Sequence, residues 1–261
     1  MQALKIAATG MSAQQMRVDV TANNIANMST TGYNARRAEF ADLHYMQLRA
    51  PGAIAAATGQ VIPTGVQLGL GVRPAAISME PAQGTVRATG GELDLAIEGA
   101  GYFEVELPSG ESAYTRDGSF KVTGDGEVVT SAGYPLLPEL TVPEDAREII
   151  INADGTVFAR FVNQVDVEQI GEITIAAFVN EKGLEAVGDN LFRETAASGE
   201  PRIGQTGIDG RGTLRQGYLE ESSVDVVAEI TELIEAQRGY ELNARVIAAA
   251  DEMLSATTRI R

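Results

Sequence analysis

The sequence predicts an α+β protein in which two terminal helices pair as an antiparallel coiled coil and an extended connecting arm leads to an antiparallel β-rich domain. Near both ends of the chain, apolar residues recur every seven positions, which is typical of coiled-coil helices. The middle of the chain has short apolar runs separated by glycine-containing turns, which is typical of antiparallel strands. The expected parts are residues 1–30 (N-terminal helix), 31–75 (arm), 76–218 (β-rich domain) and 219–261 (C-terminal helix pairing with 1–30).

The N-terminal helix is expected over residues 2–27, which contain no proline. Gly10 is its one poor helix former, and a glycine there would allow a neighbouring helix to approach closely. The seam of the expected coiled coil consists of Leu4, Met11, Val18 and Ile25, with Ala8, Gln15 and Ala22 at the offset of four.

The C-terminal helix is expected over residues 223–258, with Ser222 and Asp225 as a capping box. Its length would be about 54 Å, whereas the β-rich domain should have a diameter of about 30–35 Å. The helix would therefore extend beyond the domain, which favours burial of its apolar seam against other chains. A two-helix hairpin packed on the β-rich domain is the alternative. The seam consists of Val226, Leu233, Tyr240, Ile247 and Leu254, with Ile230, Gln237, Ala244, Asp251 and Thr258 at the second position.

The β-rich domain should be a meander or a barrel, because its strands follow one another without helical spacers. Two of its turns have glycines that are typical of hairpin connections. The two expected hairpins join residues 121–123 to 127–130 around Gly124-Asp125-Gly126, and residues 149–151 to 156–158 around Asn152-Ala153-Asp154-Gly155.

The segment between the first helix and this domain, from Ser29 to Arg73, is rich in Gly, Ala, Thr, Pro and Gln and has weak periodicity. A structureless loop of this length is unusual inside a compact domain. We therefore expect an extended arm that lies on neighbouring subunits.

The formal net charge of −16 is concentrated in residues 45–213, which hold 11 basic and 24 acidic side chains. Nucleic acid is not expected as a partner, since phosphate contacts require a basic face.

The absence of cysteine excludes disulfides, thiolate zinc sites and a cysteine nucleophile. No run approaches about 18 apolar residues, so direct membrane insertion is not expected, and the N-terminus lacks the pattern of a cleaved signal peptide.

No residue pattern supports an enzyme, a metal site or a cofactor site. His44 is the single histidine and has no recognisable ligand set or nucleophile near it in the sequence. Asp125 and Asp154 lack the twelve-residue ligand spacing of a calcium loop, and turn chemistry explains both. No catalytic residue, metal ligand or cofactor is therefore expected.

Four strings are far more specific than these signals. They are ALKIAATGMSAQQMRVDV from Ala3, ANNIANMSTTGYNARRAEF from Ala22, AYTRDGSF from Ala113, and GYLEESSVDVVAEITELIEAQRGYELNARVIAAADEML from Gly217. In order and spacing, the chain resembles the flagellar rod and hook axial family over nearly its whole length. The segment from Asp42 to Ile77 resembles the connecting arm of rod subunits, and the length leaves no room for the additional outer domain of a hook subunit.

The resemblance implies a structural subunit of the flagellar basal body, with paired terminal helices in an inner core and the β-rich domain outside. The implied partners are other copies of the chain, proximal rod proteins, the hook protein, the outer-ring bushing proteins and the type III export apparatus, with export without a cleaved signal peptide to a rod that spans the periplasm. A secreted adhesin is the alternative from a different class, although aromatics make up only 5% of the chain. The implied assembly residues include Asn23, Asn24 and Asn27, with Gly32 and Gly118 at turns.

Overall fold

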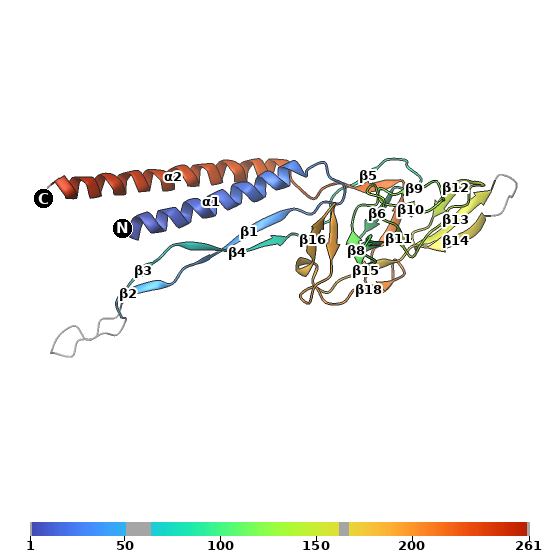
Figure 1. The fold of residues 1–261 in the computed structure, drawn as a ribbon, viewed down its shortest axis with the longest axis horizontal. Coiled ribbons are helices and arrows are strands. Elements are labelled where there is room, and N and C mark those ends of the chain that lie inside the picture. The colour runs from blue at the N-terminus through green and yellow to red at the C-terminus, as the bar shows by residue number, and fades with distance from the viewer. Residues whose placement is uncertain (1, 51–63, 162–166, 260–261) are drawn as a thin grey trace. The chain divides into compact units, whose positions relative to one another are not determined.

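The computed structural model describes residues 2–50, 64–161 and 167–259. The chain forms two compact units (Figure 1). The helical unit comprises residues 1–25, 36–78 and 226–261, and the β unit comprises residues 26–35 and 79–225. The chain therefore passes between the two units four times.

Two long helices dominate the helical unit, α1 (Gln2–Ala26) and α2 (Val226–Arg259). Their existence and approximate ends confirm the sequence prediction. The expected capping box is wrong, because α2 begins at Val226 and Ser222 lies before it, where its hydroxyl accepts a hydrogen bond from the Val224 amide at 3.4 Å. Neither helix, within the described ranges, is long and apolar enough to cross a membrane.

The described part of the expected extended arm is a two-stranded ribbon. The strand β1 (Arg36–Asp42) pairs with β4 (Val72–Met79), and β2 (Tyr45–Arg49) pairs antiparallel with β3 (Val66–Gly69). Part of the expected arm, residues 51–63, lies outside the described residues. The Val72 amide donates to the Thr9 hydroxyl at 3.3 Å, so the ribbon contacts α1 of its own chain.

The β unit is built from short antiparallel strands. Its largest sheet has the order β16-β17-β8-β7-β15-β18, and β11 pairs with β7. A three-stranded sheet, β12-β13-β14, and the pairs β19-β6, β20-β5 and β10-β9 complete the unit. The bounds are β5 (Val86–Ala88), β6 (Leu95–Glu98), β7 (Tyr102–Glu106), β8 (Ser112–Thr115), β9 (Lys121–Val122), β10 (Val128–Val129), β11 (Leu136–Leu137), β12 (Ala146–Ile151), β13 (Thr156–Phe161), β14 (Val167–Glu172), β15 (Ile175–Ala177), a 3-10 turn (Glu181–Gly183), β16 (Glu185–Gly188), β17 (Leu191–Arg193), β18 (Arg202–Gly204), β19 (Thr213–Gln216) and β20 (Tyr218–Glu220).

Both expected hairpins are confirmed as the antiparallel pairs β9–β10 and β12–β13. Gly126 and Gly155 close them with φ of 87° and 89°, a backbone conformation that favours glycine. The core of the unit is aliphatic with a few aromatic rings, such as Phe103 and Phe120 packed edge to face at 5.0 Å. Burial of these inward-facing side chains holds the sheets together.

Candidate assembly site

The two helices contact each other through small and polar residues. A Cβ atom added to Gly10 would lie 2.8 Å from the Asn243 side chain, and one added to Gly239 would lie 3.0 Å from Gln14. Both glycines thus allow a close approach, as the sequence predicted for Gly10. Further along, Arg17 faces Glu232 at 3.8 Å. As residue numbers fall along α1 they rise along α2, so the two helices run antiparallel.

The predicted apolar seams are not the face on which the two helices meet most closely. Ala7, Ala13, Thr21 and Asn24 are the buried residues of α1. The seam residues Leu4, Met11, Val18 and Ile25 are only half-buried. A coiled coil packed through these seam residues is therefore not confirmed. The two helices approach each other most closely at the small residues Gly10 and Gly239 instead.

On α2, the seam divides into half-buried and exposed positions. Tyr240, Ile230 and Leu254 are 45%, 46% and 40% exposed. Val227, at 75%, is the most exposed of the large apolar residues on the helix. The half-buried members are Val226, Leu233, Ala244 and Ile247. A long helix with this much exposed apolar surface has the character of an interaction surface.

Asn24 joins three elements of the helical unit and is only 1% exposed. Its amide nitrogen donates to the Arg36 carbonyl and to the Glu229 carboxylate, both at 2.8 Å, and its amide oxygen accepts from the Arg36 backbone at 3.0 Å. Asn24 thus links α1, the start of β1 and the first turn of α2. Of the neighbouring asparagines, Asn23 is exposed and Asn27 half-buried.

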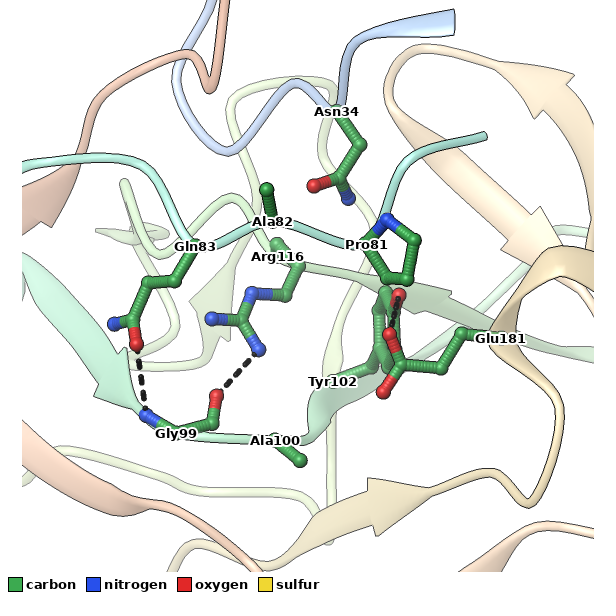
Figure 2. A pocket seen from close by; sticks show the side chains of 9 residues that line it. All are labelled: Asn34, Pro81, Ala82, Gln83, Gly99, Ala100, Tyr102, Arg116 and Glu181. Carbon is green, nitrogen blue, oxygen red and sulfur yellow. Dashed lines mark hydrogen bonds between the residues drawn. The ribbon is translucent and has the colours of Figure 1, made fainter. Parts of the chain in front are cut away.

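In the β unit, Arg116 and Glu220 form a buried ion pair at 2.7 Å, with side chains 7% and 3% exposed. The guanidinium also donates to the Gly99 carbonyl at 2.9 Å (Figure 2). It donates to the Gly101 carbonyl at 2.8 Å as well. Another donor faces the Ile97 carbonyl at 3.4 Å. The N–H groups of Arg116 are therefore committed to protein acceptors, which is what a buried guanidinium requires.

Around this ion pair, the two segments that leave the β unit are hydrogen-bonded to each other. The Gly32 amide donates to the Glu220 carbonyl at 2.8 Å. The Ser223 amide donates to the Tyr33 carbonyl at 3.0 Å, and the Ala35 amide donates to the Ser223 hydroxyl at 2.9 Å. These bonds join residues 32–35 to residues 220–223 within the β unit, and together with the Arg116–Glu220 pair we call them the junction network.

The two predicted turn glycines both lie directly against another backbone segment. Gly32 has φ of 63°, and a Cβ there would lie 2.7 Å from the Arg116 carbonyl carbon. At Gly118 a Cβ would lie 1.7 Å from the Leu95 carbonyl oxygen, which no side chain tolerates. Both positions therefore require glycine because another backbone passes close by.

A cavity of about 150 Å³ lies beside Arg116, lined also by Asn34, Gln83, Tyr102 and Glu181 (Figure 2). The Tyr102 hydroxyl donates to Glu181 at 3.3 Å. Burial, followed by the Glu181 carboxylate, raises the pKa of Tyr102 above its ordinary value. Tyr102 is therefore a neutral hydrogen-bond donor, and the N–H groups of Arg116 beside the cavity already have protein acceptors.

Arg116 and Glu220 were not singled out from the sequence. Their partnership spans 104 residues, and no local periodicity connects them. One signal was available, because Arg116 is a basic residue that directly follows the buried strand β8, within the specific string AYTRDGSF.

Comparisons with known proteins match this chain to flagellar rod and hook proteins from its first helix to its last. Family models match residues 4–34 (Flagella basal body rod protein), 96–159 (Flagellar hook protein FlgE/F/G D1 domain) and 215–260 (Flagellar basal body rod FlgEFG protein C-terminal). A flagellar basal-body rod protein FlgG of Caulobacter vibrioides is 49% identical over 100% of both chains. One of Agrobacterium fabrum is 48% identical over 99% of each. The solved flagellar hook protein FlgE2 of Helicobacter pylori matches 71% of this chain and 43% of its own, at 18% identity and a TM-score of 0.25, too low for structural argument.

Proposed function

Because this chain belongs to the flagellar basal-body rod protein family, we propose that it is a structural subunit of the distal rod, which self-assembles into the hollow shaft between motor and hook. It is a structural protein and not an enzyme. Its work is mechanical: it passes torque along the rod, and exported subunits travel through the channel. Its neighbours are further copies of itself, the proximal rod proteins, the hook protein and the outer-ring bushing.

The observation that carries this proposal is the exposed apolar surface of α2. Within one chain, the helices meet on small and polar side chains, and large apolar residues such as Val227 and Leu242 are 75% and 61% exposed. Neighbouring copies supply the missing burial, so the helices of residues 1–30 and 219–261 form the inner core of the rod. Assembly is then coupled to removal of apolar surface from water.

A proximal rod subunit of the same family is the second candidate. Electron microscopy of detergent-extracted basal bodies, labelled with antibodies against this chain, separates the two. We expect label on the rod segment beside the outer rings, and loss of that segment together with the hook when the chain is deleted. Label at the inner-membrane end would assign the chain to the proximal rod, and basal bodies without label would contradict both assignments.

A further inference from the structure

The helices α1 and α2 lie side by side (Figure 1), and the face on which α1 meets α2 has a repeat of its own. Small and polar residues recur along α1 at alternating steps of three and four, which places them on one side of the helix. They are Ala7, Gly10, Gln14, Arg17, Thr21 and Asn24. We call this set the polar seam, and its members Ala7, Thr21 and Asn24 are buried.

Two contacts of the polar seam are reciprocal, because each helix presents a glycine to a side-chain amide of the other. A Cβ added to Gly10 would lie 2.8 Å from Asn243 Oδ1, and one added to Gly239 would lie 3.0 Å from Gln14 Cδ. The Asn243 amide is held in place, since its Nδ2 donates to the Gly239 carbonyl at 2.9 Å. The two amides therefore occupy the space that side chains at the two glycines would need.

These contacts share one axial register. The step of four residues from Gly10 forward to Gln14 is matched by a step of four back along α2, to Gly239. Ten residues beyond Gln14, Asn24 donates to Glu229 at 2.8 Å, and Glu229 lies ten residues before Gly239. One pairing of α1 with α2 thus satisfies the contacts at both ends of the polar seam.

The apolar seams alone would not select this register. They repeat every seven residues on both helices, so a slip of seven, about 10.5 Å along the axis, returns apolar positions to apolar positions. The same slip places Val246 or Glu232 opposite Gln14, where the observed register has Gly239. Since even a Cβ there would lie 3.0 Å from Gln14, either side chain would push the helices apart.

We propose that the two glycine–amide contacts are a register lock, which sets the axial position of α1 against α2 so that every copy presents the same apolar surface to its neighbours. Polar groups in a helix seam specify register at a cost in stability. Gln14 shows that cost, because its Oε1 is buried and accepts no hydrogen bond from the described residues. The role in assembly rests on the proposed function, since copies in a helical shaft repeat one contact.

The register can be measured because the chain contains no cysteine. Ala7→Cys combined with Val246→Cys belongs to the locked register, and Ala7→Cys combined with Met253→Cys belongs to a register slipped by seven. A disulfide requires Cα atoms within about 7 Å, so the first pair should oxidise at least about tenfold faster in the purified full chain. Equal rates, or a faster second pair, would overturn the register lock.

Gly10→Asn tests the lock itself, because it places a second amide against Asn243. Asparagine favours a helix slightly more than glycine does, so a loss of the disulfide preference would not reflect helix propensity. Gly10→Asn combined with Asn243→Gly exchanges the two sides of the contact and should restore the preference. Ser12→Asn, at an exposed position of α1, is the matched control and should keep it. A preference that survives Gly10→Asn, or that the exchange does not restore, would contradict the proposal.

Assembly is then compared in a strain that lacks the chain. Gly10→Asn should lower incorporation into basal bodies about tenfold, and the exchange variant should recover it. If the unsubstituted chain does not restore rods, the proposed function falls, while the disulfide rates still decide whether the register lock exists. If Gly10→Asn loses the register and builds rods as well as the unsubstituted chain, the link from register to assembly is overturned.

Discussion

Replacing Arg116 by methionine is expected to lower the free energy of unfolding by about 3–5 kcal/mol, the usual effect of removing one partner of a buried ion pair. The side chains of Arg116 and Glu220 are 7% and 3% exposed, so water would not solvate the carboxylate left behind. The Gly99 and Gly101 carbonyls would lose their donor as well. Urea unfolding of the full chain, followed by tyrosine fluorescence, measures the change, since five of the seven tyrosines belong to the β unit.

Arg193 provides the matched control for Arg116. It pairs with Glu185 at 2.8 Å, but the two side chains are 44% and 55% exposed. Arg193→Met should therefore change stability by less than about 1 kcal/mol. In Arg116→Met combined with Glu220→Leu, part of the loss should return, because no unpaired carboxylate remains buried. Equal effects at Arg116 and Arg193 would mean that the junction network does not hold the β unit together.

Asn24→Asp should destabilise the helical unit by about 2–3 kcal/mol. The substitution removes the amide donor to Arg36 and to Glu229, and it places a second carboxylate beside Glu229 at a position that is 1% exposed. Circular dichroism at 222 nm reports on this unit, since both α-helices of the described chain belong to it.

Gln15→Glu makes the corresponding change from amide to carboxylate at an exposed position of α1. Its effect should stay below about 1 kcal/mol, as for most surface substitutions. If the two variants unfold at the same urea concentration, Asn24 does not organise the junction of α1, β1 and α2.

The sequence predicted the elements better than it predicted their contacts. Seven-residue spacing located both helices to within a few residues, and glycine turns located both hairpins. Periodicity identifies which residues favour burial, but it does not identify what buries them. The closest helix contact instead uses Gly10 and Gly239, whose small size matters only once a partner helix is present.

The residues that join the elements were only partly predictable. The family resemblance singled out Asn24, Gly32 and Gly118. In the structure Asn24 hydrogen-bonds to α2, and the two glycines leave no room for a side chain. Arg116 and Glu220 were missed because a pair separated by 104 residues leaves no spacing pattern. The Ser222 capping box failed because the chain continues in a non-helical conformation up to Asp225.

Removal of residues 226–261 tests most directly the central claim that the terminal helices assemble the rod. The truncation retains Ser223, whose hydrogen bonds to Tyr33 and Ala35 belong to the junction network. The truncated chain should keep the cooperative unfolding of the β unit, yet it should be absent from basal bodies in a strain without the full chain. A truncated chain that keeps its fold and still builds rods would contradict the account.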